Sequence, residues 1–273
     1  MTSDAKAVEG TGAARKFGRM ADDWIKLDLH IHTLDDRKDA LDYTAHQLLA
    51  RAKQLRFSVL AITLHDSVFD RREVFEDAKA MGILLISAAE MRLHGADIVL
   101  LNVHPQEIDS LKNFDDVRRL RAARGDSLFT FAPHPFYVMG GSIGGKRLVE
   151  NIDCFDAIEI CHFHKGWFDR NRPARKVAAQ FGKPLLATSD AHELRAFGSH
   201  YTSIPRPIAL TAENVFAELR AHRARLTSPP ATLVDLFSTM YFIFVQHPLQ
   251  RRRRDALAPH CSHAKKAALE SQA

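Results

Sequence analysis

The stretch Lys26–Thr33 reads Lys-Leu-Asp-Leu-His-Ile-His-Thr, and its apolar residues fall at every second position. This alternation predicts a short buried strand. Residues two apart on a strand point to the same face, so His30 and His32 project side by side from its end, with Asp28 behind them. Neutral imidazole is the commonest side-chain ligand of borderline divalent metals. The pair indicates a metal site only if other segments supply partners, because two unrelated histidines explain it equally well.

The composition is that of an ordinary globular protein. The chain has 273 residues, 46% hydrophobic and 26% charged, which suits one α/β barrel or two small domains. Its three cysteines are too few for a disulfide framework, which favours a reducing, cytoplasmic location. The net charge is +5, but residues 246–273 hold six basic against two acidic residues, a net +4. The body is nearly neutral, which argues against nucleic acid as a partner of the main domain.

Short apolar runs alternate with amphipathic segments along the chain, in the repeated order strand, loop, helix. This order predicts a parallel α/β barrel or a doubly wound sheet. The predicted strands cover residues 25–31, 58–63, 83–87, 97–103, 127–131, 155–160 and 184–188. The predicted helices cover residues 44–56, 71–80, 114–123, 170–181 and 211–223.

Histidine and acidic residues follow the carboxyl ends of six predicted strands, and active sites form at that end of a parallel barrel. Taken singly, each has an ordinary explanation as a loop, capping or turn residue. Their coincidence at one pole predicts a polynuclear metal site. The candidate ligands are His30, His32, His65, Glu90, His134, His162, His164, Asp190 and His192.

The types of these side chains narrow the chemistry. Many histidines with a few carboxylates and no cysteine suit Zn, Mn or Fe. A carboxylate such as Glu90 or Asp190 can bridge two ions. Bridged ions about 3.5–4 Å apart can activate a water between them and grip both oxygens of an in-line displacement. Such a site suits hydrolysis of a phosphate ester.

Five ordered motifs between about residues 25 and 223 resemble those of the PHP (polymerase and histidinol phosphatase) domain family. They are Asp28–Thr33 for its DLHxHT motif, Ala61–Asp66 for AITDHD, Ala88–Glu90 for GxE, Ala132–Pro135 for its histidine-proline motif and Thr188–His192 for SDAH. The resemblance implies an α/β fold, a distorted (β/α)7 TIM-like barrel, with two or three divalent ions and metal-dependent phosphoesterase activity. It implies as metal ligands His30, His32, His65, Glu90, His134, Asp190 and His192, with Glu90, Asp190 and His192 also catalytic.

The sequence departs from the family pattern around this ligand set. Asp97 stands where a histidine is usual, and His162 stands where an asparagine is common. The acidic residue of the loop after the first motif is matched by Asp35 or Asp36. Candidate further metal ligands are therefore Asp36, His162 and His164.

The expected reaction is hydrolysis of a phosphomonoester or small phosphodiester by a metal-activated water, with a small phosphorylated compound as the partner. Arg92 and Arg195 lie near the motifs and are candidate phosphate-binding residues. A non-catalytic, metal-stabilised binding barrel is one alternative, because Leu64 replaces an acidic residue of the AITDHD motif. An amidohydrolase-like C–N hydrolase is the other, because HxH barrels also serve that chemistry.

Three regions are expected: a disordered leader over residues 1–24, the hydrolase barrel over residues 25–225 and a helical tail over residues 226–273. Within the tail, residues 233–245 are strongly apolar and Arg251–Arg254 follow. One interpretation is a helix docked on the barrel, followed by a solvated charge run. The other is an interfacial helix that contacts an anionic membrane peripherally. The apolar run is too short and too interrupted to span a bilayer.

Overall fold

The computed structural model describes residues 23–137, 140–165 and 169–232, with six further positions between 237 and 249. The leader predicted over residues 1–24 lies outside this part of the chain, except for its last two residues. The basic run Arg251–Arg254 and most of the predicted tail helix also lie outside it. Both therefore stay predictions. Among the described residues, the longest apolar helices fall short of what a membrane span requires.

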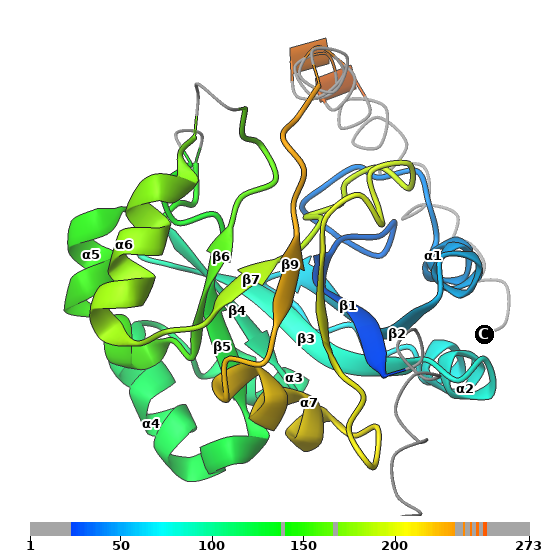
Figure 1. Cartoon of the computed structure of the whole chain (residues 1–273), viewed down its shortest axis with the longest axis horizontal. Coiled ribbons are helices and arrows are strands. Elements are labelled where there is room, and N and C mark those ends of the chain that lie inside the picture. Colours follow the sequence, from blue (N-terminus) through cyan, green and yellow to red (C-terminus); the bar gives the residue numbers. More distant parts are fainter. Residues whose placement is uncertain are drawn as a thin grey trace, which may run out of the picture.

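In the described part of the chain, nine strands form one sheet that curls into a nearly closed barrel (Figure 1). Their spatial order is β7-β6-β5-β4-β3-β2-β1-β8-β9. The expected barrel-like α/β fold is confirmed, and the seven predicted strands form β1 to β7. Their ends shift by small amounts, except that β3 extends six residues beyond its predicted end to Leu93. The strands are β1 (Trp24–Ile31), β2 (Phe57–His65), β3 (Leu84–Leu93), β4 (Ala96–Leu101), β5 (Phe129–Ala132), β6 (Ala157–Ile160), β7 (Leu185–Ala187), β8 (Tyr201–Pro205) and β9 (Arg225–Thr227).

The expectation of an all-parallel sheet is wrong at β4, which runs antiparallel to both β3 and β5. β3 turns directly into β4 through His94 and Gly95, whose φ angles are 50° and 78°. Two consecutive residues with positive φ match the type I′ turn, whose twist suits antiparallel strands. β8 and β9, which the sequence pattern does not predict, add antiparallel pairs beside β1.

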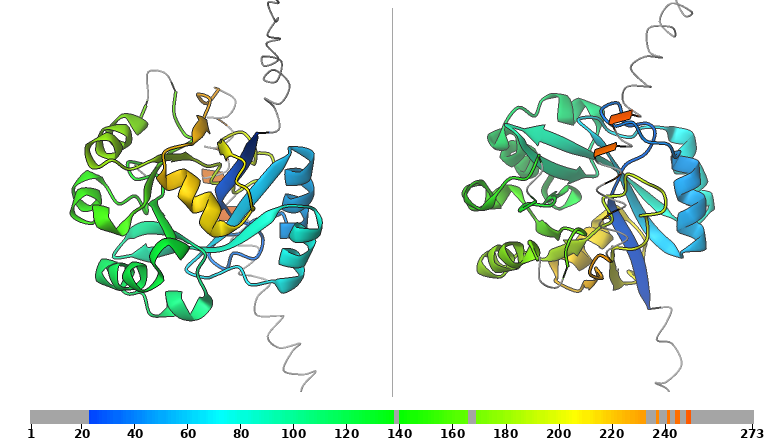
Figure 2. Two further views of the ribbon diagram at one scale, coloured as in Figure 1. Left: turned by 60° about the horizontal axis from the view of Figure 1, so that its bottom comes forward. Right: turned by 90° about the horizontal axis from the view of Figure 1, so that it is seen from above.

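Amphipathic helices cover the outside of the sheet and pack their apolar faces on it (Figure 2). α1 begins at a capping box in which the Thr44 hydroxyl accepts from the Gln47 amide, which satisfies a free amide of the first turn. Gly182 follows α6 in the left-handed conformation, a common helix end. The helices are α1 (Ala45–Gln54), α2 (Arg72–Ala80), α3 (Pro105–Asp109), α4 (Phe114–Arg124), α5 (Gly145–Glu150), α6 (Asn171–Phe181) and α7 (Ala212–Arg220). The five predicted helices correspond to α1, α2, α4, α6 and α7.

Helix α7 lies across one end of the barrel, at the bottom of Figure 1 and in front in the left view of Figure 2. Its buried side chains Val215, Phe216 and Leu219 join the inward-facing apolar residues of the strands in one cluster. Phe216 stacks on Phe129 of β5 with 5.2 Å between ring centroids. This packing covers the end of the barrel where β1 and β5 begin, so buried polar groups collect at the opposite end.

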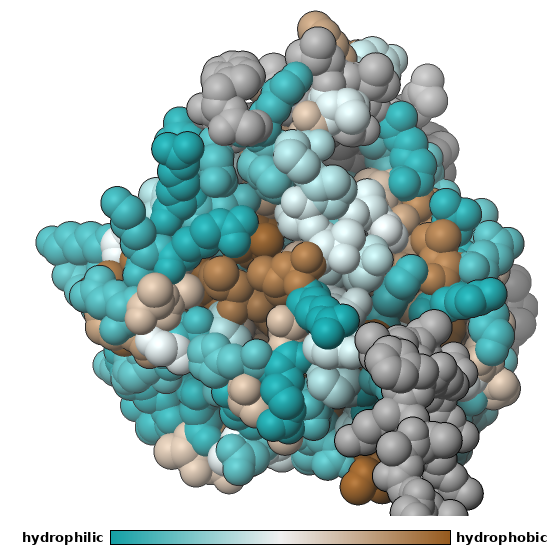
Figure 3. All heavy atoms as spheres, in the orientation of Figure 1, coloured by the Kyte–Doolittle hydropathy of each residue, from teal (hydrophilic) through white to brown (hydrophobic). Residues whose placement is uncertain are grey.

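The sheet meets itself between β7 and β8 through side-chain hydrogen bonds. The Thr202 hydroxyl accepts from the Ala187 amide at 3.0 Å and donates to the Ala187 carbonyl at 2.9 Å. Outside this seam, a hollow of about 470 Å³ opens between α6, β7 and β9, with Leu185 and Leu226 in its lining. Figure 3 shows an apolar patch there, surrounded by hydrophilic side chains. The barrel is therefore nearly rather than fully closed.

Candidate metal centre

The seven ligands implied by the family resemblance lie together at the barrel end opposite α7. They comprise His30 in β1 and His32 directly after it, His65 at the end of β2, Glu90 in β3, His134 after β5, and Asp190 and His192 after β7. The carboxyl ends of parallel strands meet at this end of an α/β barrel. Only Glu90 departs from the expected position, because β3 continues beyond it to Leu93.

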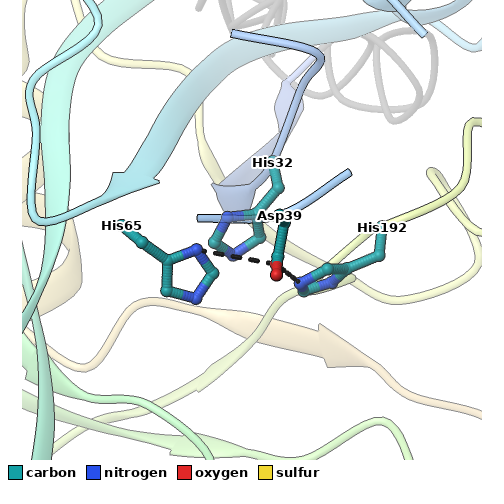
Figure 4. A group of neighbouring side chains, drawn as sticks. All are labelled: His32, Asp39, His65 and His192. Carbon is teal, nitrogen blue, oxygen red and sulfur yellow. Dashed lines mark hydrogen bonds and ion pairs between the residues drawn. The ribbon is translucent and has the colours of Figure 1, made fainter. Parts of the chain in front are cut away.

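Three overlapping groups of side chains have ligand atoms that all lie within 4.8 Å of one another. The groups are His32, Asp39, His65 and His192; His30, His32 and Asp190; and His30, Glu90 and His134. Figure 4 shows the first group, with the Asp39 carboxylate between the rings of His65 and His192. The groups share His30 and His32, so together they form one continuous site.

Glu90 connects the histidines of this site through both of its oxygens. Its Oε2 lies 3.4 Å from the Nε2 atoms of His30 and His32. The same oxygen lies 3.2 Å from His65 Nε2. Its Oε1 lies 3.3 Å from His134 Nε2. One carboxylate therefore faces four imidazoles, which is the arrangement expected of a bridging ligand.

Asp190 is the second connecting carboxylate. Its Oδ1 lies 3.4 Å from the Nε2 atoms of both His30 and His32, and 3.5 Å from His192 Nδ1. Its backbone adopts a left-handed conformation with φ of 45°. This conformation is strained for a residue with a side chain and persists where the surroundings hold it, here by directing the carboxylate into the site.

The outer nitrogens of the two central histidines are already occupied. His30 Nδ1 donates to Glu159 at 3.0 Å, and His32 Nδ1 donates to Asp36 at 3.2 Å. With Nδ1 protonated, the Nε2 atom of a neutral imidazole carries a lone pair. Both Nε2 atoms are buried without a hydrogen-bond partner among the described residues. Lone pairs that face carboxylates in a buried site need a positive charge between them, so these residues fit a divalent cation.

The same carboxylates shift the pKa values of the outer histidines. Burial opposes the charged form of His134, but the hydrogen bond and charge of Glu90 outweigh it and raise the pKa of His134 to about 9. Burial also opposes the charged form of His192, and Asp190 and Asp39 outweigh it, so the pKa of His192 rises to about 9. Protons and metal ions therefore compete for the same nitrogens.

We expect the affinity for divalent ions to fall as the pH drops below about 9. His134 and His192 must each lose a proton before their nitrogens can bind an ion. Release of these two protons alone should raise the apparent affinity by up to about 100-fold per pH unit below pH 9. A competition titration against a chelating dye, from about pH 7 to 10, measures this slope. A constant affinity over that range would contradict the expectation.

Two acidic residues that the sequence pattern does not single out, Asp39 and Glu159, also lie in the site. Asp39 Oδ2 lies 2.9 Å from His192 Nε2 and 3.6 Å from His65 Nδ1. The loop that holds Asp39 has no periodic pattern, so the only sequence signal for this residue is the cluster of aspartates at residues 35–39. Glu159 accepts from His30 Nδ1 and lies in β6, whose other residues are apolar. A charged residue in a buried apolar strand needs a partner, and this was an available signal.

The candidate further ligands occupy other positions. Asp36 accepts hydrogen bonds from the Nδ1 atoms of His32 and His65, at 3.2 and 2.8 Å, and so orients both rings from behind. His162 and His164 belong to none of the three groups found among the described residues. His164 Nε2 instead lies 3.1 Å from the Ser228 hydroxyl. Metal ligation by these residues stays a prediction.

Both candidate phosphate-binding arginines pair with carboxylates. Arg92 donates two hydrogen bonds to the buried Asp97, at 2.6 and 2.8 Å. Arg195 pairs with Glu193 at 2.8 Å. Gly141 packs so closely on the first pair that a Cβ there would lie 1.6 Å from an Asp97 oxygen. Asp97 is therefore engaged by Arg92 rather than directed at the histidines.

Comparisons with known proteins agree with this architecture. A family model described as PHP-associated matches residues 168–224, whereas no curated protein matches the sequence. A two-domain protein from Bacteroides vulgatus, described as containing a PHP-like metal-dependent phosphoesterase, is 17% identical over 79% of this chain and 69% of its own, with a TM-score of 0.56. PsfC from Pseudomonas syringae is 16% identical over 82% of this chain and 98% of its own, with a TM-score of 0.58. A lesion-specific endonuclease from Pyrococcus furiosus is 13% identical over 80% of this chain and 66% of its own, with a TM-score of 0.52.

At these identities the structural likeness establishes a shared fold and nothing about substrate. The segment matched by the family model runs from α6 to the end of α7 and contains Asp190 and His192. The family-model match and the shared barrel agree with the resemblance of the ordered motifs to the PHP-domain family.

Proposed function

We propose that this protein is a metal-dependent hydrolase of a phosphomonoester or a small phosphodiester. The observation that carries the proposal is the pair of buried Nε2 atoms of His30 and His32, each 3.4 Å from both Glu90 Oε2 and Asp190 Oδ1. Nitrogen lone pairs and carboxylate oxygens that converge in this way suit a divalent ion. The PHP-like metal-dependent hydrolase fold supports an enzymatic rather than a purely structural role.

Three sets of side chains would hold two or three ions of Zn, Mn or Fe. The sets are His30, His32, Glu90 and Asp190; His65, Asp39 and His192; and His134 with the second oxygen of Glu90. Such ions, when bound, supply the positive charge that acidifies a water and neutralises a phosphate during in-line displacement.

The proposed catalytic residues are Glu90, Asp190 and His192. Burial opposes ionisation of Asp190, but the charges of His30 and His192 outweigh it and hold its pKa well below the usual range. Burial is outweighed in the same way at Glu90, whose pKa is also well below its usual range. Both carboxylates therefore stay anionic at neutral pH and can hold cations or accept a proton. The Asp39 carboxylate orients the His192 ring toward Asp190.

Arg92 is a better candidate than Arg195 for binding the phosphate of the substrate. Asp97 fixes the Arg92 guanidinium while about half of its side chain stays exposed. Arg92 follows Glu90 by two residues on β3, so the two side chains point to the same face of the sheet. A fixed guanidinium with an accessible edge can bind phosphate oxygens. Arg195 is more exposed.

Nucleic acid is the second candidate substrate class, because a solved structure of similar fold is a lesion-specific endonuclease. The nearly neutral body of this chain favours a small phosphate ester over duplex DNA, since DNA binding needs a basic surface.

The test combines metal analysis with a substrate panel. The protein loaded with Zn, Mn or Fe is assayed on 4-nitrophenyl phosphate, bis(4-nitrophenyl) phosphate, glycerol phosphate, duplex DNA with an abasic site, and a set of amides. We expect two or three ions per chain and hydrolysis of a monoester or small diester that a chelator abolishes. Cleavage of DNA alone, or of amides alone, would replace the proposed substrate class. Bound ions without any turnover would favour the binding barrel.

A further inference from the structure

Two buried carboxylates lie behind the metal centre and contact its histidines from outside. They are Glu159 in β6 and Asp36 in the loop after β1, with 2% and 3% of their surfaces exposed. Neither belongs to any of the three groups of ligand atoms found among the described residues. A buried carboxylate needs partners that offset its loss of water, so the contacts of each residue show which part of the centre it supports.

Glu159 contacts two proposed ligands, one with each of its oxygens. Its Oε1 accepts a hydrogen bond from His30 Nδ1 at 3.0 Å and another from the Thr188 hydroxyl. Its Oε2 accepts from the His134 amide at 2.6 Å. His30 lies in β1 and His134 follows β5. One side chain of β6 therefore fixes two proposed ligands that come from different strands.

The hydrogen bond to the His134 amide matters because the backbone there is strained. The φ of His134 is 30°, and this left-handed conformation costs energy for a residue with a side chain. Pro135 follows, and a proline favours an extended backbone at the residue before it. The His134 carbonyl is also fixed, since it accepts from the Ser142 hydroxyl at 2.7 Å. The ring is thereby held with its Nε2 atom 3.3 Å from Glu90 Oε1.

Asp36 holds a different part of the centre. Its Oδ2 accepts from His32 Nδ1 at 3.2 Å, from His65 Nδ1 at 2.8 Å and from the His65 amide at 2.9 Å. Its Oδ1 accepts from the Asp39 amide at 3.2 Å. The Asp39 carboxylate in turn lies 2.9 Å from His192 Nε2. Every member of this group of ligand atoms (Figure 4) is therefore held by Asp36, directly or through one neighbour.

The contacts of the two carboxylates divide the centre into two halves. The Glu159 half comprises His30, Glu90 and His134, and the Asp36 half comprises His32, Asp39, His65 and His192. In the described part of the chain, neither carboxylate makes a hydrogen bond to a member of the other half. The remaining group of ligand atoms takes one histidine from each half and adds Asp190.

We propose that Glu159 and Asp36 are positioning residues, each of which sets the metal affinity of its own half of the centre. An imidazole whose outer nitrogen is fixed by a carboxylate keeps its orientation and becomes a stronger base toward a metal. Because the two carboxylates support different histidines, the affinities of the two halves can be changed separately. The inference rests on the proposed metal-dependent function but not on the identity of the substrate.

A zinc titration of the full chain at one fixed pH tests this division. A chelator buffer sets the free zinc, and NMR of 15N-labelled histidine rings reports which imidazoles bind an ion at each concentration. In Glu159→Gln, His30 and His134 should respond at about 10–100-fold higher free zinc than in the parent chain. His65 and His192 should respond at the parental concentration. Glutamine keeps the shape of the side chain, but its single carbonyl oxygen cannot replace both carboxylate oxygens.

Asp36→Asn should give the converse result. His65 and His192 should respond at about 10–100-fold higher free zinc, whereas His134 should respond as in the parent chain. Glu218→Gln is the matched control, because it removes the same charge from α7, at the other end of the barrel. All histidines of this control should respond as in the parent chain.

Glu159→Asp is a second variant, for use if Glu159→Gln does not fold as judged by circular dichroism. It keeps the buried charge but withdraws both oxygens by one methylene group, so it should weaken zinc binding in the Glu159 half in the same selective way.

Equal weakening in both halves of a folded variant would overturn the inference, and so would parental zinc binding in the variants of both carboxylates. A parent chain that binds no zinc would overturn it as well. A parent chain that shows the two halves but hydrolyses no phosphoester contradicts the proposed function and supports this inference, since the titration does not measure hydrolysis.

Discussion

Replacing Glu90 with glutamine is expected to lower the affinity for divalent ions by at least about 100-fold and phosphoester turnover by at least about 1000-fold. The substitution keeps the shape of the side chain but removes its negative charge. Oxygens of this carboxylate lie 3.2 to 3.4 Å from nitrogens of four histidines, so loss of the charge weakens every group of the site. Metal analysis and steady-state kinetics measure the two losses.

The same variant has a readout that does not depend on bound metal. The charge and hydrogen bond of Glu90 are the main causes that raise the pKa of His134 above its ordinary value. In the metal-free variant, the pKa of His134 should fall, as measured by NMR titration of the imidazole. Glu76→Gln is the control. It removes the same charge from a glutamate that is exposed and pairs with Arg72. Full metal content and turnover in the Glu90 variant would remove this residue from the proposed centre.

Replacing Asp156 with alanine is expected to lower the free energy of unfolding by about 3–5 kcal/mol. Asp156 is nearly buried and accepts hydrogen bonds from Arg121 at 2.5 and 3.0 Å, from Arg220 Nε at 3.1 Å and from the Thr130 amide at 2.8 Å. Its removal leaves two largely buried guanidinium groups without their shared carboxylate. Denaturant unfolding with matched metal content measures the loss.

Asp153→Ala is the matched control for this prediction. Asp153 pairs with Arg118 but is more than half exposed, and an exposed ion pair contributes at most about 1 kcal/mol. Burial opposes ionisation of Asp156, but Arg121 outweighs it and holds the pKa of Asp156 below its usual value. A lowered pKa stabilises the fold above the unfolded pKa and is lost as the pH falls through the folded value. The difference between the parent chain and Asp156→Ala should therefore shrink below about pH 4. A loss below about 1 kcal/mol at neutral pH would contradict the account.

Local patterns were sufficient for strands β1 to β7, for five of the seven helices in the described chain and for their order. Alternating apolar residues around His30 mark β1, and a buried β-rich run marks β2. These signals are local because a strand or helix buries a face whose period is already present in its own residues. The order of strands and helices then predicts one end of a barrel where strand ends meet. The strand ends alone predict nine candidate ligands at one pole, and the family resemblance narrows them to seven, whose ligation is a proposal.

Pairing and direction depended on the tertiary structure. The reversal of β4 follows from a two-residue turn at His94 and Gly95, whose left-handed backbone is weakly encoded because histidine is not a strong signal for it. The sequence pattern does not predict β8. It also does not predict the hydrogen bonds between Thr202 of β8 and Ala187 of β7 that join these two strands. Strand pairing joins residues far apart in the chain, so its energy appears only when the whole sheet forms.

The order of apolar strands and amphipathic helices along the sequence determined the fold class, and the His30–His32 strand pointed to a candidate metal site. The inner surroundings of that site were decided by tertiary packing. Asp39 meets His192 although 153 positions separate them, and Glu159 reaches His30 across the barrel. The role of each of these two carboxylates depends on which imidazole lies within about 3 Å of it. In a desolvated space, a carboxylate at that distance interacts strongly with an imidazole. Local sequence carries the period of each element, whereas the buried charge network exists only after the elements have packed.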